Sequence, residues 1–189
     1  MRVGILGGTF DPIHLGHLAA ARAALDCAQL DRVLFIPTGV PPHRPPTVAD
    51  SEQRIEMCRL AIDDEKGFEV SDIEVRRKGV SYTVDTLREL RRLHPDDELF
   101  LILGWDAAKL LPTWHEPDEV RRLATVVIVT RPGSGPPTGT SDTVCERPTP
   151  DISASKLRRA LARGERVTDM LPEAVAAYVA THGIYRDNR

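Results

Sequence analysis

The sequence lacks the features that would place it at a membrane or on nucleic acid. No apolar run approaches the ~20 residues that a membrane-spanning helix needs, and the short apolar start runs straight into Gly7-Gly8, unlike a signal peptide. The net charge is only −3, without the basic excess typical of general nucleic-acid binding. We therefore expect a cytoplasmic protein that binds neither membranes nor nucleic acid.

Cysteine is scarce as well. The three cysteines, Cys27, Cys58 and Cys145, lie far apart in the sequence and form no Cys-x-x-Cys motif. Their odd number and their spacing argue against a disulfide framework and against a structural zinc site. We expect buried structural thiols instead, at least for Cys27 and Cys58.

Two common phosphate-binding patterns are also missing. The chain contains neither the redox fingerprint G-x-G-x-x-G nor the Walker A pattern G-x-x-x-x-G-K-[ST], even in its glycine-rich stretch at 133–139. A nicotinamide-dependent dehydrogenase is therefore disfavoured. Any phosphate groups must be bound in another way.

What the sequence does contain is the alternation of strands and helices of an α/β protein. With 189 residues, of which 41% are hydrophobic, it suits one domain with a full core. Strands are expected at residues 2–6, 32–36, 68–75, 99–103 and 124–129, because these are short β-rich or apolar runs. Helices are expected at 15–30, after Ser51 as the cap, and at 83–93, 106–111, 118–123, 153–163 and 172–181. The stretch 131–141 is expected to be a loop.

This order predicts a Rossmann-like, doubly wound parallel sheet. The first strand, helix and strand form a βαβ unit with a right-handed crossover. We expect a single domain over residues 1–189, with a small C-terminal helical portion at about 151–189.

The most informative segment is Gly7-Gly8-Thr9-Phe10-Asp11-Pro12-Ile13-His14-Leu15-Gly16-His17, where the first strand gives way to the first helix. Glycines let a backbone approach a phosphate closely, and a helix N-terminus offers free N–H groups and a positive dipole. Because His14 and His17 are three residues apart, their rings can lie on one side of the turn and donate to phosphate oxygens. For either histidine alone, a cap or a buried structural group is the alternative. A metal site is weaker, because no third ligand stands at a clear local spacing.

This segment resembles the T/HxGH signature of the nucleotidyltransferase superfamily. Further segments, in matching order along nearly the whole chain, are similar to those of bacterial nicotinate-nucleotide adenylyltransferases. They are Pro41-Pro42-His43-Arg44, Ser81-Tyr82-Thr83-Val84-Asp85-Thr86-Leu87, Leu103-Gly104-Trp105-Asp106, Leu111-Pro112-Thr113-Trp114, Ile152-Ser153-Ala154-Ser155-Lys156-Leu157-Arg158 and Tyr178…His182-Gly183-Ile184-Tyr185. The resemblance implies an enzyme of NAD biosynthesis that transfers AMP from ATP to nicotinate mononucleotide, without a covalent enzyme intermediate. Its Mg²⁺ would be carried by ATP.

The resemblance also implies a set of site residues. The catalytic residues would be His14, His17 and Arg158. The ATP-binding residues would be Gly7, Gly8, Thr9, Phe10, His14, His17, Gly104, Asp106, Arg131, Ile152, Ser153, Ser155 and Arg158. The substrate-binding residues would be Thr9, His43, Arg44, Tyr82, Thr83, Trp114 and His115. None of these residues is expected to hold a metal ion.

Several of these roles have a physical reason of their own, each with a structural alternative. Asp106 can hydrogen-bond a ribose hydroxyl, or it can cap the helix that follows. Tyr82 and Thr83 open a helix, whose free N–H groups can bind the carboxylate of nicotinate. Trp114 offers a stacking face for a pyridinium ring, or it packs in the core. Ser153 is first of all an N-cap residue.

Two positions depart from the family pattern, and other functions stay open. Ala154 stands where relatives carry a hydroxyl, and Trp105 stands where a small residue is usual. Pantetheine-phosphate adenylyltransferases are usually shorter than this chain. Cytidylyltransferases carry a different C-terminal signature. A preference for nicotinamide mononucleotide, dual specificity, or a non-catalytic nucleotide sensor on the same fold are the alternatives. A homo-oligomer is compatible with the sequence.

Overall fold

The computed structural model describes residues 1–41, 46–130, 142–147 and 149–186. In these residues six strands form one sheet in the order β3-β2-β1-β4-β5-β6, and every neighbouring pair is parallel. The strands are β1 Arg2–Gly8, β2 Arg32–Pro37, β3 Phe68–Val70, β4 Glu98–Gly104, β5 Thr125–Val129 and β6 Thr143–Cys145. The strand order reverses between β1 and β4, which confirms the Rossmann-like, doubly wound prediction.

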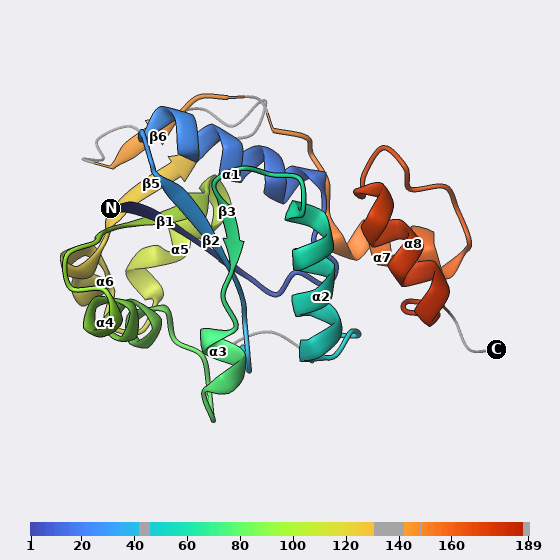
Figure 1. Ribbon diagram of the computed structural model, residues 1–189, viewed down its shortest axis with the longest axis horizontal. Helices are drawn as coiled ribbons and strands as arrows, with labels where there is room; N and C mark the ends of the chain where they lie inside the picture. The colour runs from blue at the N-terminus through green and yellow to red at the C-terminus, as the bar shows by residue number, and fades with distance from the viewer. Residues whose placement is uncertain (42–45, 131–141, 148, 187–189) are drawn as a thin grey trace.

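Helices cover both faces of the sheet (Figure 1). They are α1 Leu15–Cys27, α2 Ser51–Ile62, α3 Ile73–Arg76, α4 Thr83–Leu93, α5 Trp105–Leu110, the 3₁₀ turn η1 Leu111–Thr113, α6 Pro117–Leu123, α7 Ala154–Ala162 and α8 Glu173–His182. Among the described residues there is no helix long and apolar enough to cross a membrane.

The core has two parts, one on each face of the sheet. In β4 successive side chains alternate between them: Leu101 joins the cluster under α4 and α6, and Ile102 joins the cluster under α1 and α2. This alternation is the period of two that a strand imposes. Because both faces of β4 are covered, the strand reads as an unbroken apolar run.

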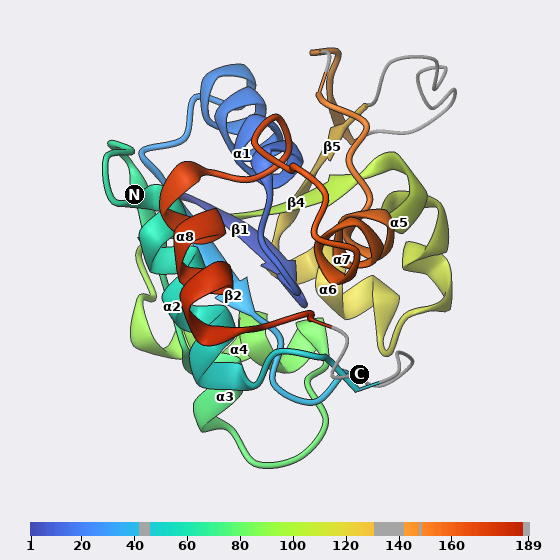
Figure 2. The ribbon, with the colours of Figure 1, turned by 90° about the vertical axis from the view of Figure 1, so that its right-hand side faces the viewer.

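The C-terminal helices complete the second cluster. Leu157 of α7 and Val175 and Val179 of α8 are buried together with Leu18 of α1 and Met57 of α2. Figure 2 shows α8 lying along α2, on the side of the sheet that α1 also covers. Residues from both ends of the chain therefore share one hydrophobic core.

Two local expectations are wrong, and one strand was not expected. Asp50, not Ser51, caps α2: it accepts a hydrogen bond from the Gln53 backbone N–H at 2.8 Å, and the Gln53 side chain accepts from the Asp50 N–H at 3.1 Å. The strand expected at 68–75 ends at Val70, and a short helix begins at Ile73, with Asp72 paired to Arg76 at 2.8 Å. Strand β6 was not expected, because its short run carries no apolar alternation.

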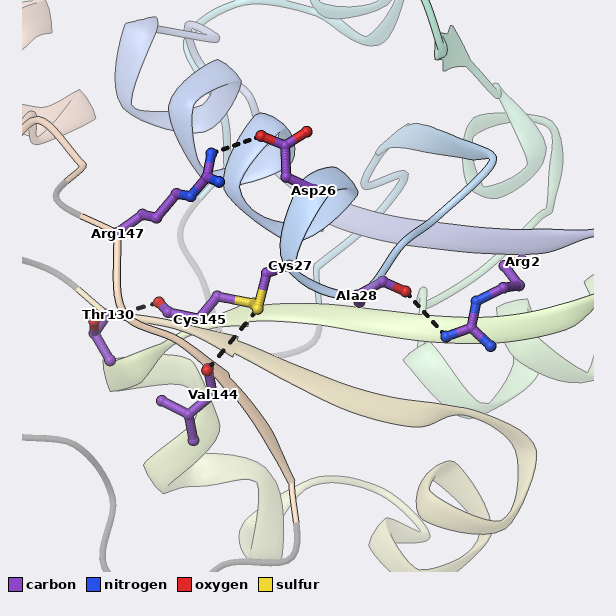
Figure 3. Close-up of a disulfide and its surroundings, with 8 residues drawn as sticks. All are labelled: Arg2, Asp26, Cys27, Ala28, Thr130, Val144, Cys145 and Arg147. Carbon is purple, nitrogen blue, oxygen red and sulfur yellow. Dashed lines mark hydrogen bonds and ion pairs between the residues drawn. A yellow bond between two sulfur atoms is a disulfide. The ribbon is translucent and has the colours of Figure 1, made fainter.

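The cysteine prediction is also wrong in part. Cys58 is a buried free thiol, but Cys27 is exposed and forms a disulfide with Cys145 (Figure 3). The pairing of β6 with β5 brings Cys145 beside the end of α1, where the two Cα atoms are 5.9 Å apart. Arg147 pairs with Asp26 at 2.6 Å next to the disulfide. A separation of 118 residues left no local signal for this contact.

Candidate active site

The two histidines of the first motif form a stacked pair at the start of α1. Their ring centroids are 3.6 Å apart and the rings are inclined by only 21°. His14 is buried and occupies the N-cap position, whereas His17 is half-buried in the first turn. The rings thus lie on one side of the turn, as their spacing predicts.

The orientation of His17 is fixed by its neighbours. Its Nδ1 accepts a hydrogen bond from the His14 backbone N–H at 3.2 Å. In neutral His17 the proton is therefore carried by Nε2, because Nδ1 is used as an acceptor. The ring of Phe10 meets His17 edge-on at 5.0 Å. His17 is consequently a positioned hydrogen-bond donor at the N-terminus of a helix.

Gly16, between the two histidines, is required by close packing. A Cβ at this position would lie 3.0 Å from Nδ1 of His14 and 3.2 Å from the carbonyl oxygen of Pro150. Any larger residue would therefore push the His14 ring or the segment that leads into α7. This contact brings the Ile152 and Ser153 segment toward the histidine pair, although it is far away in the sequence.

Asp11 holds the motif to three distant parts of the chain. The residue is only 4% exposed, and its carboxylate accepts hydrogen bonds from the N–H groups of Val48 and Ala49 and from the Tyr185 hydroxyl at 2.7 Å. Arg158 of α7 donates to the Asp11 carbonyl oxygen at 2.7 Å, and its guanidinium lies 3.7 Å from the carboxylate. Burial and the Asp11 charge together raise the pKa of Tyr185. Arg158 is thereby placed beside the glycine turn.

A buried cation lies on the inner side of the same turn. Arg54 of α2 is only 2% exposed and donates to the carbonyl oxygen of Thr9 at 2.9 Å. Burial lowers the pKa of Arg54, and the negative charge of Asp11 opposes this effect. Sequence reasoning missed the roles of Arg54, Asp11 and Tyr185. Asp11 and Tyr185 stood within the quoted segments, but nothing in the sequence indicated that they meet.

A cavity of about 490 Å³ opens beside this turn, at the carboxyl ends of the central strands. Its walls come from the end of β1, the start of α4 and the residues after η1. Of the predicted site residues it contains Gly7, Gly8, Thr9, Tyr82, Thr83, Trp114 and His115. Ligands of doubly wound sheets bind at this edge, where the strand order reverses.

The far wall of the cavity combines aromatic rings with a helix end. Trp114 is half-buried, and the rings of Tyr82 and His115 lie 4.4 Å apart. Thr83 is the first residue of α4. Tyr82 occupies the N-cap position, but its side chain makes no capping hydrogen bond. The first N–H groups of α4 need partners from outside the helix, so this end suits an anion.

The residues predicted to bind adenosine lie in part elsewhere. Gly104 ends β4 in open space, since nothing comes within 4 Å of a Cβ built there. Gly104 is also the N-cap of α5, so the alternative that Asp106 caps this helix is wrong. Asp106 is exposed and pairs with Lys109 at 2.8 Å. Neither Gly104 nor Asp106 lines the cavity.

The C-terminal segment places its residues at the start of α7. Ser153 occupies the N-cap position, yet its side chain makes no capping hydrogen bond. Ile152 is buried and Ser155 is exposed. His43, Arg44 and Arg131 lie outside the described residues. Within residues 1–41, 46–130, 142–147 and 149–186, no three His, Cys, Asp or Glu side chains group as metal ligands would.

Comparison with known proteins places this geometry in context. Residues 5–160 match the model of the cytidylyltransferase-like family. A probable nicotinate-nucleotide adenylyltransferase of Thermus thermophilus is 48% identical, over 98% of this chain and 100% of its own length. A protein of the same name from Oceanobacillus iheyensis is 40% identical, over 97% of this chain and 96% of its own.

Solved structures share the fold at much lower identity. The nicotinic acid mononucleotide adenylyltransferase of Plasmodium falciparum, complexed with NaAD, superimposes with a TM-score of 0.82. It is 18% identical to this chain, and the match covers 97% of both chains. At this identity the similarity shows a common fold.

Proposed function

The chain belongs to the nicotinate-nucleotide adenylyltransferases of the cytidylyltransferase-like family, and we propose that it transfers AMP from ATP to nicotinate mononucleotide. The products are nicotinate adenine dinucleotide and pyrophosphate, in NAD biosynthesis. One observation carries the proposal: a single cavity begins at Gly7, Gly8 and Thr9, the turn that leads into the histidine pair, and ends at Trp114 and the start of α4. The cavity therefore connects a proposed phosphate-binding site to a proposed binding site for a positively charged aromatic ring.

The reaction is an in-line attack of the mononucleotide phosphate on the α-phosphorus of ATP. The nucleophile is already anionic near neutral pH, so no general base is required. Catalysis then rests on positioning and on stabilising the charge of the transferring group. His17 and His14 supply preorganised donors at the α-phosphate, and Arg158 supplies a guanidinium that matches phosphate geometry.

Further phosphate contacts are proposed from the family pattern. Gly7, Gly8, Thr9 and Phe10 form the turn against which the phosphates lie. Arg131 and Arg44 add positive charge. Mg²⁺ enters as part of the substrate, bound by the triphosphate of ATP.

The adenosine of ATP is proposed to lie by the exposed end of β4. Gly104 leaves room for the nucleoside, and Asp106 accepts hydrogen bonds from the ribose hydroxyls. The Ile152, Ser153 and Ser155 segment closes this side, with the Ser153 hydroxyl not used for capping. Trp105 narrows the site relative to the small residue that is usual there.

The pyridine of the mononucleotide is proposed to lie in the cavity. Trp114 stacks on the pyridinium ring, and the N–H groups at Tyr82 and Thr83 receive the ring carboxylate. His115 packs against Tyr82 and completes this wall. From the family pattern, His43 is proposed to contact the substrates. The shared core of the N- and C-terminal helices supports the proposal that residues 1–189 act as one domain.

Pyrophosphate release with MgATP tests the function, with nicotinate and nicotinamide mononucleotide compared as acceptors. We expect kcat/KM to be higher for the acid by about 10²-fold, equivalent to about 2.7 kcal/mol. Equal values for the two acceptors would support adenylyltransferase activity but contradict the proposed preference for the acid. No release with either acceptor would contradict the proposed function and favour a nucleotide sensor.

A further inference from the structure

Tyr185 follows the last helix, yet its hydroxyl contacts the first motif of the chain. The hydroxyl donates to Oδ1 of Asp11 at 2.7 Å, across 174 residues of sequence. Tyr185 is only 6% exposed, and its ring belongs to the hydrophobic cluster that α1, α2, α7 and α8 share. The contact lies beside Arg158, which donates to the carbonyl oxygen of the same Asp11. The proposed reaction gives Tyr185 no role so far.

The contacts of Asp11 are divided between its two carboxylate oxygens. Oδ1 accepts from the Ala49 N–H at 3.0 Å and from the Tyr185 hydroxyl. Oδ2 accepts from the Val48 N–H at 2.9 Å. One nitrogen of Arg158 donates to the Asp11 carbonyl oxygen at 2.7 Å, and the same nitrogen stays 3.7 Å from Oδ2. Arg158 is therefore held by the backbone of the motif, without a close ion pair to its carboxylate.

This arrangement decides where the charge of Arg158 is used. A charged N–H donor and a carboxylate in a close pair lie about 2.7–2.9 Å apart, so the distance to Oδ2 leaves the pair open. Donors from Val48, Ala49 and Tyr185 already stabilise the Asp11 charge, and this weakens its attraction for Arg158. Burial and the Asp11 charge raise the pKa of Tyr185, so its hydroxyl keeps its proton and remains a donor.

We propose that Tyr185 is a positioning residue for ATP, whose hydroxyl satisfies the Asp11 carboxylate and so leaves the Arg158 guanidinium for the phosphate groups. This inference rests on the proposed function, because Arg158 is proposed to act at the α-phosphate. Without the hydroxyl, the buried Oδ1 of Asp11 loses a donor. Arg158, whose side chain is 30% exposed, can then turn toward the carboxylate and away from the substrate.

The second cation near Asp11 cannot take this place as easily. Arg54 is only 2% exposed, and it already donates to the carbonyl oxygen of Thr9 at 2.9 Å. A movement of Arg54 would leave that carbonyl oxygen without this donor. Arg158 is therefore the cation whose position depends on Tyr185.

The backbone on both sides of the contact is strained, which supports a functional reason for it. Tyr185 has a φ of +67°, and Phe10, directly before Asp11, has a φ of +47°. Residues with large side chains rarely adopt such angles, and they do so where surrounding contacts hold them, often at ligand sites. The hydrogen bond to Asp11 connects these two strained positions.

The test is a double-mutant cycle on Tyr185 and Arg158, measured as kcat for pyrophosphate release with MgATP and nicotinate mononucleotide. Tyr185→Phe keeps the buried ring and removes only the hydroxyl, and urea denaturation confirms that the variant is folded under the assay conditions. We expect kcat to fall about tenfold, with KM for the mononucleotide unchanged. In Arg158→Ala, the same substitution should cause no further loss, because the residue on which Tyr185 acts is gone.

Tyr178→Phe is the matched control. It removes a hydroxyl from α8, where the Tyr178 ring lies 4.0 Å from that of His182, and kcat should stay as in the wild type. If Tyr185→Phe lowers kcat equally with and without Arg158, Tyr185 only braces the turn and the proposal is overturned. An unchanged kcat in Tyr185→Phe would overturn it as well, while turnover itself would leave the proposed function standing.

A second measurement requires no turnover. Calorimetry gives the Kd for MgATP, without a mononucleotide, for the wild type, the two single variants and the double variant. Tyr185→Phe should weaken binding several-fold when Arg158 is present and should have no effect when it is absent. No pyrophosphate release by the wild type would contradict the proposed function alone, and this binding cycle would then decide the role of Tyr185. Equal weakening in both backgrounds would contradict that role.

Discussion

The two ends of the active-site cavity are built in opposite ways. At the glycine turn, buried charged and polar side chains from separate parts of the chain converge on one short segment, with Asp11, Arg54 and Tyr185 among them. At the other end, which Trp114 and the start of α4 line and which we call the pyridine end because the pyridine is proposed to lie there, the walls are mostly apolar and aromatic, and Glu74 is a buried carboxyl. The glycine turn holds hydrogen-bond donors in fixed positions, whereas the other end of the cavity provides a space whose shape can select a ring.

This difference matches what each region must do. A charge that develops in a transition state is stabilised best by donors that need no reorganisation. Selection between two similar rings depends instead on shape, stacking and one or two polar groups. We therefore expect changes at the glycine turn to affect folding and kcat, and changes at the pyridine end to affect KM and acceptor choice.

Asp11→Ala should have the largest effect. It leaves the buried Arg54 without the negative charge that acts on it most strongly, and it removes the acceptor of three hydrogen bonds. We expect the free energy of unfolding to fall by about 3–5 kcal/mol, measured by urea denaturation. Asp26→Ala, which breaks the exposed pair with Arg147, is the control and should cost less than about 1 kcal/mol. Equal losses in the two variants would mean that the Asp11 network does not brace the turn.

Reduction of the disulfide should come next. It joins the end of α1, the helix that begins at the histidine pair, to β6 across 118 residues of sequence. Because a cross-link restricts the unfolded chain, reduction should lower the free energy of unfolding by about 2–4 kcal/mol. Cys27→Ser should abolish the difference between oxidising and reducing conditions. A difference that survives in Cys27→Ser would contradict this assignment.

His17→Ala should lower kcat by about 10²-fold, the scale of losing one preorganised donor. The variant should also lose about 1 kcal/mol of stability, because the His17 side chain forms half of the capping box at the start of α1. Steady-state pyrophosphate release measures the effect. His182→Ala, at the end of α8, is a control for loss of an exposed histidine. A rate near that of the wild type would remove His17 from the mechanism.

Trp114→Ala should have the smallest effect and should act on one substrate. Loss of stacking is expected to raise KM for the mononucleotide about tenfold, equivalent to about 1.4 kcal/mol. KM for ATP, measured on the same variant, should stay unchanged and serves as the internal control. An unchanged KM for the mononucleotide would mean that Trp114 only packs against the core.

Local sequence patterns predicted the elements whose periodicity is strong. Helix α4 begins and ends where its apolar spacing indicated, and β4 was recognised from its unbroken apolar run. Strand β6 escaped notice, because three residues at a sheet edge carry almost no pattern. Asp50 and Ser51 are both good cap residues, so only the structure could distinguish them.

The candidate site was predictable where its residues are neighbours in sequence. The spacing of His14 and His17 predicted that their rings lie on one side of the turn, and the resemblance to a known family named the residues that are proposed to hold the pyridine. The contacts that support the site join residues far apart, such as Asp11 with Tyr185 and Arg54 with Thr9. Such contacts depend on the packing of α2 and α8, which no local pattern encodes.

The division of labour between the two ends is tested most directly by one set of kinetic measurements. The wild type and His17→Ala are compared with both mononucleotides as acceptors. We expect kcat to fall by about the same 10²-fold for each acceptor, and we expect the ratio of kcat/KM for acid and amide to stay as in the wild type. A changed ratio, or an unchanged kcat, would contradict the separation of chemistry from acceptor choice.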